Sequence, residues 1–306
     1  IILFALIWIG AGAAIVLPPF SWSEVVPEIS LATLPFFATV VLLFAGMEMA
    51  GFYALAVKKP QTDYPRAMFL SAALIFILTV LGTLAIAFVI PADKLNLASG
   101  VMQALSYFFI TANVAWLIAP MAVLITIGGV VLLAAWLIGP AKGLGVVAEE
   151  GNMPPLFNRT NRYGAPVAVL LIQAAIGTVI SLLYVFLPSV NQAYWILSAM
   201  TVELLCIVYV LVFVSLIKLR YSQPEKPRAF TIPGGMPGVW IVGGLGAFGV
   251  IFTFIIGLLP PDYFVNFWGY LFTVLFGTII LAVPPLIFLK MKKPEWAQGG
   301  TGGMKP

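Results

Sequence analysis

The stretch Phe44-Ala45-Gly46-Met47-Glu48-Met49-Ala50-Gly51 places a carboxylate inside a long apolar run, between two glycines. A charged side chain at membrane depth is costly, so it is rare unless it lines a cavity or has a partner. Gly46 and Gly51 weaken the helix on either side of Glu48. Many transporters build a site near the midplane from a broken helix of this kind. The stretch therefore predicts a discontinuous membrane helix that contributes to a binding site.

The composition of the whole chain predicts an integral membrane protein. Of its 306 residues, 62% are hydrophobic and only 8% are charged, a balance that soluble domains do not show. The apolar runs are continuous and long enough to cross a bilayer, which takes about 20 residues. Backbone groups in lipid must be satisfied internally, so we expect an all-α protein.

The apolar runs divide into about eight expected spans, separated by loops rich in proline and glycine. They cover roughly residues 1–17, 34–57, 67–90, 114–139, 165–187, 193–219, 238–259 and 267–289. Residues 100–113 are apolar but too short to cross, and we expect an interfacial helix there. Residues 142–163 are expected to form the longest loop. The chain begins without Met inside an apolar run, so we expect further sequence before residue 1.

The basic residues sort to one side of these spans. All of the Lys and Arg residues except Lys94 fall in alternate connections or in the C-terminal tail. Such a bias orients a membrane protein with its basic side in the cytoplasm, so we expect a cytoplasmic C-terminus. The excess of positive charge thus serves orientation, and we expect no nucleic-acid partner.

Two acids, Glu48 and Glu203, fall inside the expected spans. Each is a candidate for function, and the alternative is a protonated carboxyl in an interhelical hydrogen bond. A carboxyl that exchanges a proton at depth can couple protonation to a conformational step. Tyr209 carries a hydroxyl at depth that needs a hydrogen-bond partner. Glu48, Glu203 and Tyr209 are therefore candidate proton-coupling or gating residues.

Trp136 is the aromatic candidate for substrate contact. Its ring can pack on a carbon chain or stack on a charged head, and the alternative is plain core packing. The chain has no histidine, and it shows no phosphate-binding loop, nucleophile motif or metal-ligand spacing. We therefore expect no enzyme activity, no cofactor and no metal.

Several motifs resemble the amino acid–polyamine–organocation superfamily, and among its members the bacterial glutamate/GABA antiporter family. One is the stretch Phe44 to Glu48 followed by Lys59-Pro60-Gln61-Thr62-Asp63-Tyr64-Pro65-Arg66-Ala67. The others are Val89-Ile90-Pro91, Gly100-Val101-Met102-Gln103, Trp136-Leu137-Ile138-Gly139-Pro140, residues 158–166 and Arg228-Ala229-Phe230-Thr231-Ile232-Pro233-Gly234-Gly235.

The resemblance implies an inverted-repeat transporter fold in which the eight spans are helices five to twelve of twelve. Residues 1–33 would hold the last helix of the first repeat and an outer loop. Residues 34–219 would form the second five-helix repeat, and residues 220–306 two further helices and a cytoplasmic tail. It also implies that Phe44, Ala45, Gly46, Met47 and Glu48 bind the amino-acid moiety and that Trp136 contacts the substrate.

The sequence departs from the antiporter at two positions. Leu132 stands where the antiporter has a glutamate on helix eight, and Glu203 stands where it has an apolar residue. We expect an amino-acid exchanger of the inner membrane that works by alternating access. The alternative is a proton- or sodium-coupled amino-acid symporter of the same fold. The expected partners are a small amino acid, membrane lipid and a second copy in a homodimer.

Overall fold

The computed structural model describes residues 29–298 except 32, 49, 52–56, 88–89, 91–93, 188, 229, 262–263 and 265. Apart from one isolated β-bridge, the regular structure of these residues is helical. The helices are α3 (Leu34–Phe44), α4 (Asp63–Ala87), α5 (Gly100–Thr111), η3 (Ala115–Leu117), α6 (Ile118–Glu149), η4 (Pro155–Asn158), α7 (Val167–Ser181), α8 (Leu183–Phe186), α9 (Val190–Ser222), α10 (Gly235–Gly257), α11 (Phe267–Lys290) and α12 (Pro294–Gln298).

Six helical segments of the described residues are long and apolar enough to cross a membrane. They are α4, η3 with α6, α7 with α8, α9, α10 and α11. The all-α membrane class is thus confirmed, with six candidate spans among the described residues. The first expected span, residues 1–17, lies outside the described residues. A short helix, α5, forms where the interfacial helix was expected.

The expected span over residues 34–57 is interrupted. Helix α3 ends at Phe44, and Ala45 is extended with φ −60° and ψ 135°. Gly46 follows with φ +98°, a conformation that residues other than glycine rarely adopt. Met47 and Glu48 then enter a short 3₁₀ turn. The glycine before the acid is therefore where the chain leaves the helix.

Helix α6 is longer than its apolar run predicts. The expected span ended at residue 139 and was followed by a loop, but the helix continues through Pro140 to Glu149. A proline inside a helix costs one backbone hydrogen bond, and packing compensates for this loss. Ala141 and Ala148 are buried in a cluster with Phe157 and Val169. The turns of α6 after Pro140 therefore bury one apolar face against the η4 segment and α7.

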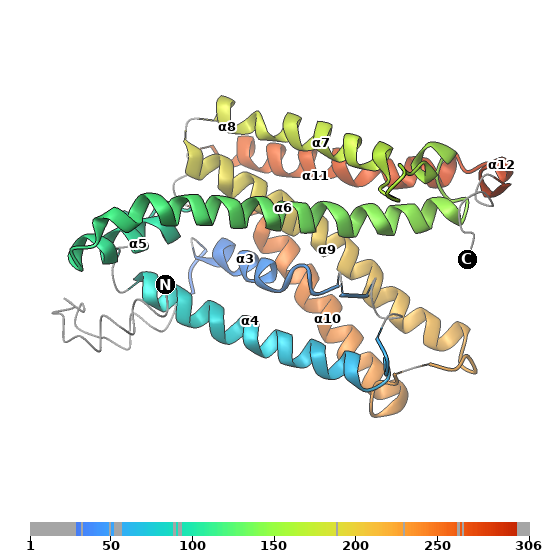
Figure 1. The fold of residues 1–306 in the computed structure, drawn as a ribbon. Coiled ribbons are helices and arrows are strands. Elements are labelled where there is room, and N and C mark those ends of the chain that lie inside the picture. Colours follow the sequence, from blue (N-terminus) through green and yellow to red (C-terminus); the bar gives the residue numbers. More distant parts are fainter. Residues whose placement is uncertain are drawn as a thin grey trace.

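The centre of the molecule is built around α9. It packs on α3, α10 and α11, and in Figure 1 it crosses behind α6. One buried cluster joins α9 to α11 through Trp195, Met200 and Tyr270. A second cluster joins α9 to α3 and α10 through residues that include Ala38 and Val250. The first half of α3 is thus held firmly just before the chain breaks.

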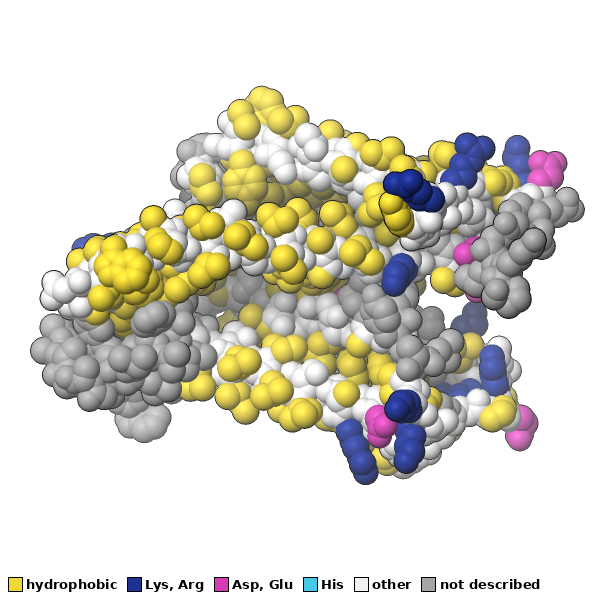
Figure 2. All heavy atoms as spheres, in the orientation of Figure 1, with side chains coloured by type: hydrophobic (Ala, Val, Ile, Leu, Met, Phe, Trp, Pro, Cys, Tyr) yellow, Lys and Arg dark blue, Asp and Glu magenta, His cyan; other side chains and the backbone are white. Residues whose placement is uncertain are grey.

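Charge is concentrated at one end of the helices. Figure 2 shows apolar side chains along the helix faces and Lys and Arg side chains gathered at the end where α12 lies. We call this the basic end. The basic residues there flank helix ends and loops: Lys58, Lys59, Arg66, Arg159, Arg162, Lys218, Arg220, Lys226, Arg228, Lys290, Lys292 and Lys293.

Candidate functional site

A cavity of about 400 Å³ lies where α3 breaks. The break contributes Ala45, Gly46 and Met47 to its wall, and two other helices complete it. The further lining residues are Ser71 and Ile75 of α4 and Leu132, Ala135 and Trp136 of α6. Exposed backbone and an aromatic face thus meet in one mostly apolar cavity, which is the composition typical of small-molecule sites.

Gly46 and Trp136 are in close contact across this cavity. A β-carbon at Gly46 would lie 3.1 Å from the Cη2 and Cζ2 atoms of the Trp136 ring. The ring therefore rests on backbone that carries no side chain. Trp136 remains 42% exposed, so part of its face is free to meet a ligand. In addition, Pro140 has no N–H to donate to the carbonyl of Trp136.

Glu48 fixes the geometry of the break. Its Oε2 atom accepts a hydrogen bond from the backbone N–H of Gly46 at 2.9 Å. The same oxygen accepts a second hydrogen bond from the hydroxyl of Tyr209 on α9, also at 2.9 Å. The first bond closes a tight loop over two residues, and the second ties that loop to the central helix. Glu48 is thus both a cap for the break and its link to α9.

The sequence-predicted residues divide into two groups in space. Ala45, Gly46, Met47 and Trp136 line the cavity, and Glu48 with Tyr209 lies beside it. Phe44 ends α3 and is half-buried, but it is not among the lining residues. The structure adds Ser71 and Ile75, which the sequence analysis missed because nothing in α4 marks one face as special.

Glu203 lies elsewhere, on the face of α9 that packs against other helices. It is fully buried. Neither of its carboxyl oxygens has a hydrogen-bond partner among the described residues. Its Oε1 atom lies against Gly257 near the end of α10. Glu203 therefore belongs to the helix interfaces around α9 and does not line the cavity at the break.

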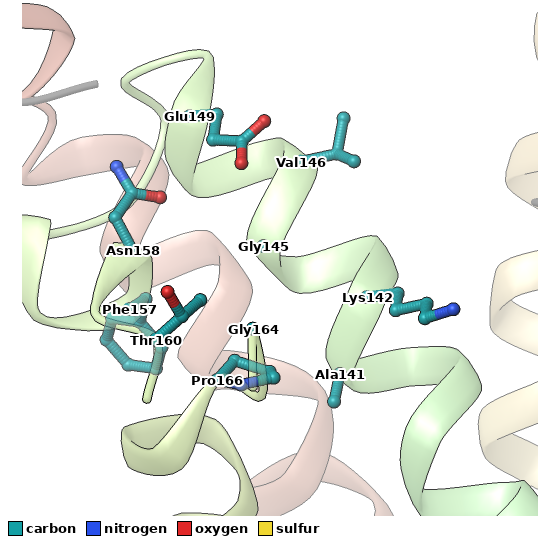
Figure 3. Close-up of a pocket in the computed structure, with 10 residues that line it drawn as sticks. All are labelled: Ala141, Lys142, Gly145, Val146, Glu149, Phe157, Asn158, Thr160, Gly164 and Pro166. Carbon is teal, nitrogen blue, oxygen red and sulfur yellow. The ribbon is translucent and has the colours of Figure 1, made fainter. Parts of the chain in front are cut away.

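A second cavity of about 360 Å³ lies at the basic end, between the last turns of α6 and the loop through η4. Figure 3 shows Asn158, Thr160 and Pro166 on the loop side and the Lys142 side chain extending away from the loop. Asn158 donates to the carbonyl of Ala148 at 3.1 Å. This cavity shares no lining residue with the first one.

Comparison with known proteins gives the family. The sequence profile described as "Amino acid permease" matches residues 1–283. The chain belongs to the amino acid permease family. This is a family of transporters and not of enzymes, and the superfamily resemblance of the motifs is thereby confirmed. The six candidate spans of the described residues agree with a multi-pass membrane protein of this family.

Three relatives illustrate the range of similarity to this chain. An uncharacterized transporter of Legionella pneumophila is 43% identical over 263 residues, which is 85% of this chain and 57% of the relative. A glutamate/gamma-aminobutyrate antiporter of Lactococcus lactis is 28% identical over 79% of this chain and 49% of the antiporter. A probable agmatine/putrescine antiporter of Lactococcus lactis is 23% identical over 89% and 58%. The chain spans about half the length of the curated relatives it matches.

Proposed function

We propose that the protein is an amino-acid exchanger that works by alternating access at the break in α3. The single observation that carries this proposal is the cavity of about 400 Å³ between the backbone at Gly46 and the ring of Trp136. The antiporters among the relatives favour exchange over symport. The alternative is a proton- or sodium-coupled amino-acid symporter of the same fold.

The chemistry of the break suits a substrate that carries a primary ammonium group. The last carbonyl groups of α3 lie at the negative end of the helix dipole and lack partners within the helix, although that of Leu42 accepts from the N–H of Ala45 at 3.3 Å. Such half-helix ends and unwound carbonyls bind cations in other broken-helix transporters. In this proposal Phe44, Ala45, Gly46 and Met47 hold the amino-acid moiety through their backbone, and Trp136 packs on its carbon chain.

Glu48 and Tyr209 act as a gate in the same proposal. The hydrogen bond between them joins the break to α9. Loss of this bond would therefore free the turn to move relative to α9. The test replaces Glu48 with Gln, which can still accept hydrogen bonds but carries no charge. A changed pH profile of transport would support a protonation role for Glu48, and an unchanged profile would remove it.

The arrangement in the membrane is also a proposal. The basic end would face the cytoplasm of a cell with an inner membrane, with the C-terminus on that side. Residues 1–33 would close the first repeat, 34–219 would form the second inverted repeat, and 220–306 would follow as two helices and a tail, in a homodimer. A reporter cysteine at Lys293 should be labelled only from the cytoplasmic side, because the native Cys206 is buried.

Proteoliposome counterflow with the full-length protein tests the function. The probes are labelled glutamate, gamma-aminobutyrate, agmatine and putrescine, each with and without unlabelled compound inside. Uptake that needs an internal substrate supports exchange, whereas uptake driven by an ion gradient alone supports the symporter. Trp136→Ala should raise the apparent KM about tenfold or more, by loss of ring contact. Trp268→Ala is the matched control, because Trp268 is 75% exposed on α11.

A further inference from the structure

Glu203 lies at the meeting point of four helices. It projects from α9, which packs against α3, α10 and α11. The Glu203 side chain is fully buried, and its Oε1 atom contacts Gly257 on α10. A β-carbon at Gly257 would overlap that oxygen. The end of α10 therefore provides a notch, shaped by the absence of a side chain, that receives the carboxyl group.

The notch is covered by a short hydrogen-bond chain. The indole Nε1 of Trp195 donates to the hydroxyl of Tyr270 at 3.3 Å. That hydroxyl donates to the carbonyl of Gly257 at 3.0 Å. Tyr270 is buried, and it links α9, α10 and α11 directly beside Glu203. The chain holds the helices together around the carboxyl without donating a hydrogen bond to it.

The surroundings of Glu203 favour its neutral form. A buried carboxylate is stable only with a counter-ion or several hydrogen bonds. Neither oxygen has a hydrogen-bond partner within the described part of the chain. The described residues of α3 and α10 include no titratable side chain. Cys206 and Tyr270 are the titratable groups that interact with the carboxyl from α9 and α11, and neither supplies a positive charge.

We propose that Glu203 is a proton-binding site of this transporter, separate from the cavity at the break and occupied by a proton in this conformation. Release of the proton requires water or a partner, and both require α10 or α11 to move away from α9. The proton therefore binds tightly in one packing of these helices and weakly in another. Protonation at Glu203 then favours the helix packing seen here, because a ligand stabilises the conformation that binds it more tightly.

Contacts with α3 connect this site to the break. Phe36 of α3 packs edge-on against Trp195, with ring centroids 5.0 Å apart. Ala38 of α3 belongs to the same buried cluster as Val202, the neighbour of Glu203. A movement of α3 at the substrate site thus disturbs both the cover of the notch and its wall. This step rests on the proposed transport function, whereas proton binding by Glu203 does not.

Infrared spectroscopy tests proton binding without any transport. We expect the full-length protein at neutral pH to show a protonated carboxyl stretching band, which shifts in D₂O and disappears in Glu203→Gln. The matched control is Glu225→Gln, the same change at an exposed position in the loop after α9, and it should keep the band. A band that is absent from the wild type, or that survives in Glu203→Gln, would overturn the proposal.

Counterflow at equal pH on both sides tests the coupling. In the wild type the rate should depend on pH, with a limit of about tenfold per pH unit for one proton. Glu203→Gln should flatten this dependence, and Glu225→Gln should leave it unchanged. Identical pH profiles in the wild type and Glu203→Gln would overturn the coupling. A Glu203→Gln variant that loses sodium dependence and keeps its pH dependence would also overturn it. Counterflow of none of the four probes would instead contradict the proposed function and leave the infrared result standing.

Discussion

Glu48 and Glu203 lie in the same apolar bundle, yet the surroundings of the two carboxyl groups differ in exposure and in hydrogen bonding. Glu48 is exposed beside a cavity and accepts two hydrogen bonds through one oxygen. Glu203 is fully buried, and neither of its oxygens has a partner among the described residues. Glu48 also stands where the helix has ended, whereas Glu203 stands in the middle of an unbroken helix of 33 residues.

The difference follows from the backbone. A helix break frees N–H and C=O groups, so a nearby acid can accept from the backbone itself, as Glu48 does from Gly46. An unbroken helix uses these groups internally, and an acid on it depends on neighbouring helices for partners. Those neighbours offer Glu203 a glycine notch rather than a donor. We therefore propose that Glu48 holds the shape of the break through its hydrogen bonds, and that Glu203 acts by binding a proton.

The largest effect is expected from Gly46→Ala. Alanine at φ +98° is strained by about 1–3 kcal/mol, and its β-carbon would press on the Trp136 ring. The turn that bonds Glu48 would be lost, and with it most of the transport. Thermal unfolding in detergent and counterflow measure the two losses. Gly177→Ala on α7 is the control, since a β-carbon there meets nothing within 4 Å. Equal behaviour of the two variants would contradict the role of the break.

Glu48→Leu should have the next largest effect, a loss of about 2 kcal/mol. It leaves the Gly46 N–H and the Tyr209 hydroxyl without their acceptor, and each orphaned donor costs about 1–3 kcal/mol if buried. The lower end applies because Glu48 is exposed. The measurement is again the unfolding temperature. Glu48→Gln should be destabilised much less than Glu48→Leu, because an amide oxygen also accepts hydrogen bonds. Equal destabilisation of the two variants would mean that the charge of Glu48, and not its acceptor oxygen, stabilises the break.

The region around the break was the most predictable part of the site. Glycines on both sides of Glu48 indicated where α3 would end, because glycine lowers helix stability by a local mechanism. The sequence could not indicate that Tyr209 bonds Glu48, since 161 residues separate them. Ser71 and Ile75 were missed for the same reason: cavity lining depends on how helices pack, and α4 is apolar on all sides.

The bounds of α6 were predicted less well. The expected span ended at residue 139 because the long apolar run ends there, and this is a local signal. The buried contacts of Ala141 and Ala148 with the η4 loop act over a longer range and outweigh it. For Glu203 the apolar run predicts a position inside a span, but no local signal in the sequence indicates which groups surround the carboxyl. The notch at Gly257 is formed by the packing of α10 against α9, a long-range contact that local sequence does not encode.

Tyr209→Phe is a smaller change at the same contact. It removes one hydroxyl that donates to Glu48 and leaves the Gly46 bond in place, so a loss of about 1 kcal/mol is expected. Counterflow should change by several-fold, because the turn stays formed but is no longer fixed to α9. Tyr221→Phe is the matched control: its hydroxyl accepts from Trp240 on α10 at 2.9 Å, away from the cavity. A larger effect in the control would remove Tyr209 from the gate.

The smallest effect on stability is expected from Glu203→Met, within about 1 kcal/mol. A neutral carboxyl that makes no hydrogen bond contributes mainly packing, and an apolar side chain of similar length can supply that. An ionised Glu203 with a partner would behave differently, because its removal would leave the partner buried and unpaired at a cost of about 3–5 kcal/mol. The ratio of the unfolding shifts of Glu203→Met and Glu48→Leu therefore decides between the two states of Glu203. A ratio below about one half supports a loaded proton site, and a ratio above about 1.5 means that Glu203 is held by a partner.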